Sequence, residues 1–338
     1  DDAATIVANG LFNKLVTLDA DYRVIPDLAD TWDISADGLT YTFRLAKNVQ
    51  WHDGPPCTAA DVKWTFEAIV REKGVAQETA ARIASIETPD AATVVMRLKE
   101  PFAPFLPNLA WIGANILPKH LYDGTDWSKN PANEKPIGTG PFKFVEWVKG
   151  DHITLAANRA YFRRGPFLDQ VTYRIYKDPV ISTDALVKGE IDYTLARPAF
   201  DKVPALQRAP GVRVQTFAHP ARYYFGFNLR RKPWDDLRAR QAVNMAINRP
   251  ALVERGLAGY GAPGFGLYTP AVVWAYNPKA QVSAFDAVGA EKLLDQAGLP
   301  RGANGARMTR SVSLVTANLS PFKEIAPVLQ EQLRLVGL

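Results

Sequence analysis

Residues 29–69 read ADTWDISADGLTYTFRLAKNVQWHDGPPCTAADVKWTFEAI. Asp37-Gly38 is a hairpin-type turn signal, and the alternation of apolar and polar side chains over residues 39–45 predicts a half-buried strand. After a second turn at residues 53–56, Thr58 and Asp61 can close a capping box in front of an amphipathic helix. The apolar positions of this strand and helix are Leu39, Tyr41, Phe43, Leu45, Val62, Phe66, Ile69 and Val70. The stretch contains no catalytic group, so its residues alone predict a scaffold.

The composition of the whole chain is that of an ordinary globular protein. Its 338 residues are 47% apolar and 22% charged, and a chain of this length is expected to form two or three domains. No window approaches the roughly 18 apolar residues of a membrane span, and residues 1–4 do not resemble a signal peptide. The charge of +5 comes from basic residues spread along the chain, which argues against a nucleic-acid partner. The single cysteine, Cys57, is expected to be a small buried residue.

Turn and periodicity signals predict further elements along the chain. Strands are expected at residues 87–98, 153–156, 171–176, 212–217 and 311–316, and residues 222–228 resemble the hinge-region strand of the family identified below. An apolar segment at residues 109–121 should lead into a helix, and other helices are expected within residues 1–15, 184–189, 234–249, 286–297 and 325–336. Pro327 should kink or delay the last helix. The polar loop at residues 123–135 is interpreted as a domain crossing.

The chain carries none of the common short signatures of catalysis or metal binding. Its four histidines are scattered without metal-ligand spacing, so we expect no metal ion and no other cofactor. It has no Gly-x-Ser-x-Gly elbow, no His-Glu-x-x-His helix and no Walker sequence. Residues 259–264 fit the letters of a dinucleotide-binding turn, but Pro263 and further glycines lie where a helix should begin, so this interpretation is rejected.

Five blocks of sequence resemble a single family. They are residues 29–69, residues 136–144 (PIGTGPFKF), residues 185–192 (ALVKGEID), residues 233–249 (PWDDLRARQAVNMAINR) and residues 286–298 (DAVGAEKLLDQAG). Together they resemble the bacterial extracellular solute-binding proteins of family 5, the dipeptide, oligopeptide and nickel-binding class of ABC transporters. Asn248 replaces the aspartate that is usual in the fourth block. Compared with the family, the chain is expected to lack the start and the C-terminal part.

The resemblance implies an α/β fold of a particular kind. This is the two-lobed type II periplasmic binding protein fold of the peptide-binding class, with an extra α/β subdomain in the first lobe. The implied division places the start of lobe 1 at residues 1–15, the extra subdomain at 16–132, the continuation of lobe 1 at 133–220 and an incomplete lobe 2 at 221–338.

The resemblance also implies a function without a chemical step. The protein would be periplasmic, exported by a signal peptide that the given chain does not contain. It would act as a monomer, capture a small solute between two lobes and deliver it to the permease subunits of an ABC importer, so it would not be an enzyme. A short peptide is the first expectation, with opines, sugars and metal chelates behind it. An extracytoplasmic hydrolase acting on peptide or glycan and a ligand-sensing receptor domain stay open as alternatives.

Aromatic side chains supply most of the candidate ligand-binding residues. Trp and Tyr offer large amphipathic faces, but most of them pack in cores, and this is our expectation for the scaffold residues Trp32, Trp51 and Trp64. Better candidates lie near the expected crossings between domains. They are Trp111 and Asn115 after a proline-rich break, and Tyr223, Tyr224 and Asn228 on a predicted hinge strand. The resemblance implies that the acidic residue with which peptide-binding members meet the ligand's amino terminus would fall in the C-terminal part that the chain is expected to lack.

Overall fold

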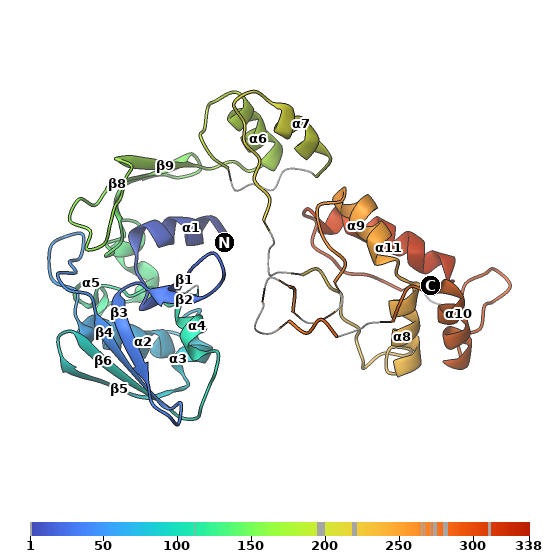
Figure 1. Cartoon of the computed structure of the whole chain (residues 1–338), viewed down its shortest axis with the longest axis horizontal. Helices are drawn as coiled ribbons and strands as arrows, with labels where there is room; N and C mark the ends of the chain where they lie inside the picture. Colours follow the sequence, from blue (N-terminus) through green and yellow to red (C-terminus); the bar gives the residue numbers. More distant parts are fainter. Residues whose placement is uncertain are drawn as a thin grey trace. The chain divides into compact units, whose positions relative to one another are not determined.

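The protein is described by a computed structural model that divides into two compact units, Asp1–Ile175 and Tyr176–Leu338 (Figure 1). The described residues are 2–111, 113–194, 200–217, 222–264, 266, 268–270, 272, 276–279, 283–309 and 312–338. The units are called unit 1 and unit 2 below, and each is described by itself. The predicted finer division at residues 15, 132 and 220 stays a prediction.

Unit 1 is built around a four-stranded antiparallel sheet with the strand order β3-β4-β6-β5. Its strands are β3 (Ala29–Ile34), β4 (Thr40–Leu45), β5 (Ile83–Asp90) and β6 (Thr93–Leu98). Helix α2 (Ala59–Arg71) contacts β5 and β6, and Figure 1 shows it lying along this sheet. The predicted strand at residues 39–45 and the predicted capped helix are therefore confirmed.

Two smaller antiparallel sheets complete unit 1. The first is the pair β1 (Val16–Leu18) and β2 (Val24–Pro26), and the second has the order β7-β8-β9, with β7 (Phe142–Val148), β8 (His152–Ala157) and β9 (Gln170–Arg174). The remaining elements are α1 (Asp2–Leu11), α3 (Gln77–Ala80), α4 (Phe105–Leu109), α5 (Lys119–Tyr122) and the 3₁₀ turns η1 (Trp127–Lys129) and η2 (Pro131–Asn133). Helix α1 contacts β7, so the second sheet is attached to the beginning of the chain.

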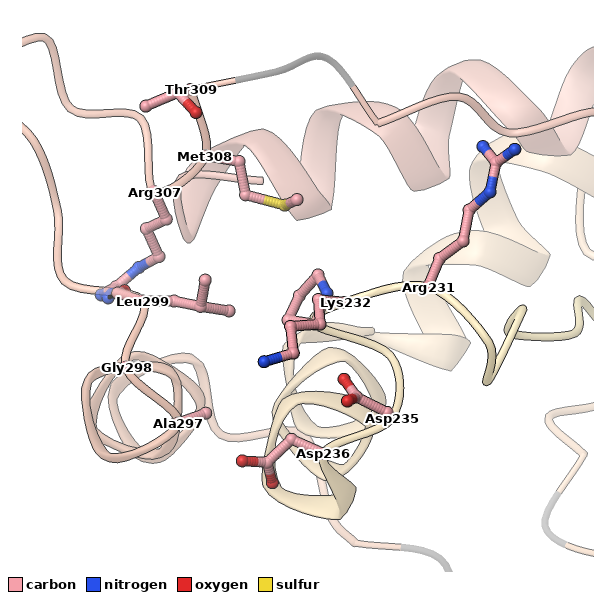
Figure 2. A pocket seen from close by; sticks show the side chains of 11 residues that line it. Arg231, Lys232, Asp235, Asp236, Ala297, Gly298, Leu299, Arg307, Met308 and Thr309 are labelled. Carbon is pink, nitrogen blue, oxygen red and sulfur yellow. Dashed lines mark hydrogen bonds between the residues drawn. The ribbon is translucent and has the colours of Figure 1, made fainter.

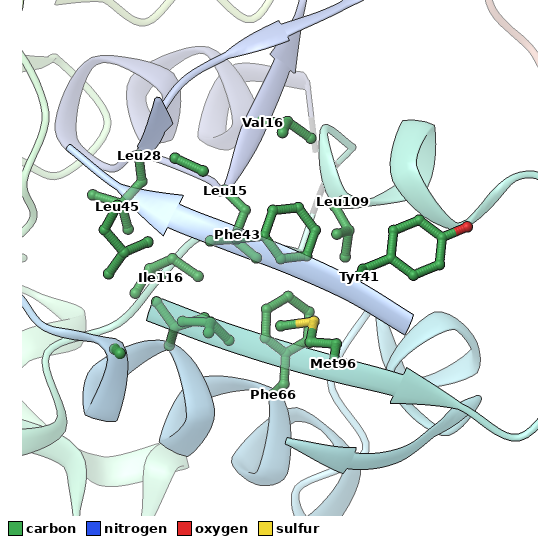
Figure 3. Packing of buried hydrophobic residues seen from close by; sticks show 14 of the residues in the cluster. Leu15, Val16, Leu28, Tyr41, Phe43, Leu45, Phe66, Met96, Leu109 and Ile116 are labelled. Carbon is green, nitrogen blue, oxygen red and sulfur yellow. The ribbon is translucent and has the colours of Figure 1, made fainter. Parts of the chain in front are cut away.

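The core of unit 1 is formed by the inward face of β4 and its neighbours. Phe43 lies opposite Val94 on β6, and both are fully buried together with Phe66 of α2 (Figure 3). Alternation along β4 puts Arg44 on the exposed face, where it pairs with Asp33. Trp51 and Trp64 are buried and Trp32 packs partly buried against the core, which confirms the prediction that they are core residues.

Helix α2 begins with a capping box that also holds a neighbouring segment. The Thr58 amide donates to Asp61 Oδ2 over 2.9 Å. This bond gives the amide at the start of the helix an acceptor that the helix backbone does not supply. The second carboxylate oxygen, Oδ1, accepts from the Lys119 amide over 3.2 Å. Because Asp61 is buried, these bonds are shielded from water and tie the start of α2 to α5.

Replacing Asp61 by alanine is expected to lower the free energy of unfolding by about 1–2 kcal/mol, because two backbone amides lose their acceptor. Urea unfolding followed by circular dichroism measures this change. Lys63→Ala is the matched control, since Lys63 is half-buried on the same helix and makes only a 3.9 Å pair with Glu67. Equal losses in the two variants would contradict the role of the cap.

The regular elements of unit 2, in the part of it that the structure describes, are helices. Its elements are α6 (Pro179–Val187), η3 (Phe200–Lys202), α7 (Val203–Arg208), α8 (Leu237–Ala246), α9 (Arg249–Leu257), α10 (Ala287–Gln296) and α11 (Phe322–Leu335). Helices α8 and α10 pack through Ala242, Ala246, Ala290 and Leu294. Asp286 caps α10 by accepting from the Gly289 amide over 2.8 Å, as the sequence predicts. Pro327 lies inside α11 without delaying its start at Phe322.

Several predicted elements are wrong. Residues 212–217, 222–228 and 312–317 form no strand, and Ser311 lies outside the described residues. The physical reason is that a strand exists only when its backbone is paired, and no backbone–backbone hydrogen bond joins residues 213–217, 222–227 or 312–317 to any described residue. The sequence pattern favours the extended conformation but does not supply a partner.

Two predictions in unit 1 are only partly right. The strand expected at residues 87–98 is a hairpin, because the chain turns after Asp90, whose carboxylate accepts from the Ala92 amide over 2.8 Å. The helix expected within residues 109–121 is reduced to the end of α4 and the short α5. Residues 110–111 and 113–118, which lie between these helices, are irregular.

Candidate ligand-binding site

The segment that links α4 to α5 presents Trp111 on a backbone fixed at both sides. The Trp111 amide donates to the Asn108 carbonyl over 3.1 Å, and the Ile116 amide donates to the Asn13 carbonyl over 2.9 Å. Between them Gly113 has a φ of +87°, and a Cβ there would lie 2.8 Å from Cβ of Val75. The indole of Trp111 nevertheless remains 60% exposed. An exposed aromatic face on a fixed backbone suits binding, because little entropy is lost when it is covered.

Asn115 lies in the same segment and carries an unpartnered acceptor. Its side-chain oxygen Oδ1 is inaccessible to solvent and accepts no hydrogen bond from the described part of the chain. A buried amide oxygen without a donor raises the free energy of the folded state by about 1–3 kcal/mol. The missing donor therefore gives an energetic advantage to a rotation of the Asn115 side chain that brings its oxygen to a bound N–H or O–H group.

A buried polar cluster formed by Asn13, Asp27, Thr139 and Tyr161, which we call the Asn13 cluster, lies next to the segment that carries Trp111 and Asn115. Asn13 Oδ1 accepts from Thr139 Oγ1 over 2.9 Å, and Asn13 Nδ2 donates to Asp27 Oδ1 over 2.5 Å and to Tyr161 Oη over 3.1 Å. Asn13 and Thr139 are almost fully buried. The cluster thus joins four separate segments of unit 1, and its Asn13 carbonyl is the group that holds Ile116.

Asp27 is the charged member of the Asn13 cluster. Burial raises the pKa of its carboxyl group, although the Lys14 amide, Asn13 and the charges of Lys14 and Arg163 act in the opposite direction. Burial also lowers the pKa of the Lys14 ammonium, which donates to Asn9 over 2.8 Å. Arg163 donates from Nε to the Asp27 carbonyl over 2.9 Å. The carboxylate itself accepts from Asn13 Nδ2 and, over 2.7 Å, from the Lys14 amide, which partly compensates it for lost hydration, so Asp27 acts as a structural anchor.

The candidate residues of unit 2 lie on the extended segment 222–228. Tyr224 is 75% exposed with the Arg222 guanidinium 5.2 Å from its ring centre, and Tyr223 is 44% exposed against Phe322. The side chain of Asn228 is exposed and accepts from the Arg230 amide over 3.1 Å. Phe225 and Phe227 pack inward on Trp234, Val243 and Leu329. These two side chains hold the segment in place, whereas the side chains of Tyr224 and Asn228 are exposed to solvent.

The five predicted residues therefore form two groups. Trp111 and Asn115 share one segment of unit 1, whereas Tyr223, Tyr224 and Asn228 share one segment of unit 2. Participation of both groups in one site stays a prediction.

Unit 2 also contains a pocket of about 680 Å³ that the sequence did not predict (Figure 2). Its lining residues are Arg231, Lys232, Pro233, Asp235, Asp236, Ala297, Gly298, Leu299, Arg307, Met308 and Thr309. The buried Arg307 is neutralised by Asp295 and Glu291, and it donates to the carbonyls of Leu299 and Val336 over 2.6 and 2.7 Å. Arg307 is thus a structural residue that fixes the end of α11 against the loop after α10.

Other ionisable groups form local pairs. His120 Nε2 lies 2.9 Å from Asp53 Oδ2, and His152 lies between Asp151 and Glu146, which raise its pKa. Within the described ranges, no group of three or more His, Cys, Asp or Glu side chains is placed to hold a metal ion. Burial raises the pKa of the Cys57 thiol well above its usual range.

Among the residues that the structure describes, no helix combines the length and apolar character needed to cross a bilayer.

The architecture defines the class of protein. The chain has the type II periplasmic binding protein fold of the peptide- and nickel-binding class. The sequence profile of the bacterial extracellular solute-binding proteins, described as family 5 Middle, matches residues 23–338, so the chain belongs to this family.

Several proteins that are similar in sequence are named as binding proteins. A Brucella ovis protein assigned as a peptide-binding protein of an ABC transporter is 35% identical over 98% of this chain and 64% of its own length. The oligopeptide-binding protein AppA of Bacillus subtilis is 32% identical, and the glutathione-binding protein GsiB of Pectobacterium atrosepticum is 30% identical, each over 100% of this chain and 64% of its own length. The chain thus spans just under two thirds of the length of these relatives.

Solved structures have the same fold. NikA from Brucella suis, in complex with Fe(III)-EDTA, matches with a TM-score of 0.85 and 27% identity over 98% of this chain and 68% of that protein. AppA from Bacillus subtilis, in complex with a nonapeptide, matches with a TM-score of 0.81 and 27% identity over 100% of this chain and 69% of that protein.

Proposed function

We propose that the protein is the substrate-binding protein of an ABC importer and captures a short peptide. The observation that carries this proposal is the segment of unit 1 on which a fixed, exposed Trp111 lies close in sequence to the unpartnered Asn115 oxygen. The indole face can cover a ligand side chain, and the amide oxygen can accept a peptide N–H once the Asn115 side chain turns outward. Family membership supports transport as the role of such binding.

A second group of candidate contacts, in unit 2, is formed by exposed side chains of the segment at residues 222–228. Tyr224 offers an aromatic face and Asn228 offers an amide. A ligand held by aromatic faces and amide groups of this kind is bound through non-covalent contacts alone. Binding and release are then sufficient, and no chemical step is needed.

The location and partners follow from the same proposal. The protein works in the periplasm as a monomer and delivers its ligand to the permease subunits of the importer, and it is not an enzyme. A peptide is preferred over a metal chelate because the candidate groups are aromatic faces and neutral amides. Solved relatives are described with a nonapeptide or with Fe(III)-EDTA, so a test must include both ligand classes.

Replacing Trp111 by alanine is expected to weaken ligand binding about 10- to 100-fold, the usual range for an aromatic anchor. The thermal midpoint should change by no more than roughly 2 °C, because the indole is exposed. Calorimetric titration of the full chain with trialanine, glutathione and the nickel–histidine complex measures the affinities.

Trp147→Ala is the matched control. Trp147 is also an exposed tryptophan of unit 1, but it lies on β7 and not on the candidate segment. Its replacement should leave the affinity unchanged. The proposal fails if none of the three probes binds, if the two variants lose affinity equally, or if mass spectrometry shows that a bound probe is cleaved.

A further inference from the structure

His52 joins two loops of unit 1 through both nitrogens of its ring. The Gly138 amide donates to Nδ1 over 3.1 Å, and Nε2 lies 3.0 Å from the Gly140 carbonyl oxygen. The backbone contributes as well, since the His52 amide donates to the Gly138 carbonyl over 2.9 Å. Three contacts therefore fix the loop at residues 138–140, here called the glycine loop, against the turn that contains His52.

This geometry requires a neutral imidazole in one tautomer. Nδ1 accepts a hydrogen bond and so carries no proton, while Nε2 faces a carbonyl oxygen and so carries the hydrogen. Protonation would put a second N–H at Nδ1, directly facing the Gly138 N–H. The imidazolium would keep the Gly140 bond and lose the Gly138 bond.

The surroundings of the ring also disfavour a positive charge. Burial lowers the pKa of His52, the carbonyl of Gly140 raises it to a smaller extent, and the charges of Lys143 and Asp53 follow with opposite signs. Lys143 reaches over from β7 and donates to the His52 carbonyl over 3.0 Å. The Asp53 carboxylate is engaged by His120 instead.

The glycine loop is connected to the candidate ligand segment by short bonds. The Gly140 amide donates to the Leu11 carbonyl over 2.8 Å, and Thr139 donates to the side chain of Asn13. The Asn13 carbonyl in turn accepts from the Ile116 amide. A displacement of the glycine loop therefore changes the support of the segment at residues 111–116.

We propose that His52 is a pH-sensitive latch: its neutral imidazole holds the glycine loop and, through Asn13, positions the segment that carries Trp111 and Asn115. At acidic pH the latch opens, the segment loses its support and ligand affinity falls. The consequence for affinity rests on the proposed function, whereas the latch itself does not.

The direction of the pH effect follows from where the proton binds first. The folded pKa of His52 is lowered, so the unfolded chain takes up the proton first as the pH falls through the ordinary value of 6.5. The contribution of the latch is therefore complete above about pH 7 and is lost as the pH falls below 6.5 toward the folded pKa. The raised pKa of Asp27 has the opposite effect, because at that carboxyl group the folded chain binds the proton first as the pH falls.

Two measurements on the full chain test the latch directly. The imidazole resonances should show His52 titrating below 6.5 and His152 above it, because the two pKa values are shifted in opposite directions. After correction for intrinsic rates, hydrogen exchange at the Gly138 amide should accelerate about tenfold between roughly pH 7 and pH 5.5.

The variant His52→Gln shows whether faster exchange at Gly138 in acid comes from protonation of His52 or from destabilisation of the whole chain by acid. Glutamine keeps a polar side chain but does not titrate, so the exchange rate at Gly138 should become independent of pH over this window. His152→Gln, at the start of β8 beside Asp151 and Glu146, is the control and should behave like the unchanged chain. If His52→Gln fails to fold, the His52 resonance is assigned by elimination with single variants of the other three histidines.

Three outcomes would overturn the proposal. One is a His52 pKa at or above 6.5, and another is the same acid acceleration at Gly138 in His52→Gln. The third is a trialanine affinity that does not depend on pH although the first two measurements succeed, which would show that the latch does not reach the ligand segment. If trialanine does not bind at any pH, the proposed function is in question, and the resonance and exchange measurements still decide the latch.

Discussion

Gly138→Ala should destabilise unit 1 by roughly 3 kcal/mol or more, one of the two largest effects expected for a single replacement in this chain. A Cβ at Gly138 would lie 1.8 Å from the Leu11 carbonyl oxygen and 2.7 Å from the carbonyl carbon. Both are backbone atoms at the end of α1, so no side-chain rotation can relieve the overlap. The glycine loop would have to move away and lose its bonds to His52.

Thermal unfolding measures this effect, and the midpoint should fall by about 6 °C or more. Gly74→Ala is the matched control, because a Cβ there would meet its nearest neighbours in Ile69 at 3.6–3.7 Å, an ordinary contact distance. A loss below about 1 kcal/mol in Gly138→Ala would contradict the close approach of the glycine loop to α1.

Phe43→Ala is expected to lower the free energy of unfolding by about 3–5 kcal/mol. The Phe43 ring is completely buried at the centre of β4, with strands on both sides and α2 beneath it (Figure 3). Truncation removes the transfer free energy of the ring and leaves a cavity, because side chains from several elements cannot all move inward. Chemical denaturation with a signal from unit 1 measures the change.

The control for Phe43→Ala lies one position further along the same strand. Arg44 points to the opposite face, and its ion pair with Asp33 is exposed, so Arg44→Ala should cost no more than about 1 kcal/mol. If the two replacements had equal effects, β4 would not have one buried and one solvent-facing side. A register shift by one residue would instead turn Phe43 outward and Arg44 inward, and would reverse the order of the two effects.

The local elements were predictable because their signals lie within a few residues. The capping box of α2 and the cap of α10 need only Thr58, Asp61 and Asp286 in front of helical periodicity. Alternation predicts β4 and β6 for the same reason. The segment at residues 222–228 shows the limit, since its alternation places Phe225 and Phe227 inward but cannot reveal whether a neighbouring backbone will pair with it.

The candidate site was predictable only in part. An aromatic residue after a proline-rich break suggested Trp111, and the structure leaves its indole exposed. The Asn13 cluster was missed, because its members come from four segments that only folding brings together. One signal was present in the sequence, because Asn13-Lys14 interrupts the apolar run of Leu11, Phe12, Leu15 and Val16. Polar residues inside an apolar run become buried when the run packs into a core, and Asn13 and Lys14 are indeed buried.

The division into two units has a consequence for spectroscopy. Six of the eight tryptophans lie in unit 1, and only Trp234 and Trp274 lie in unit 2. Intrinsic fluorescence during unfolding therefore reports chiefly on unit 1, whereas far-ultraviolet circular dichroism also follows the helices of unit 2. When the two optical midpoints differ, their separation measures how independently the units unfold, and each variant should then be assigned to the transition of its own unit.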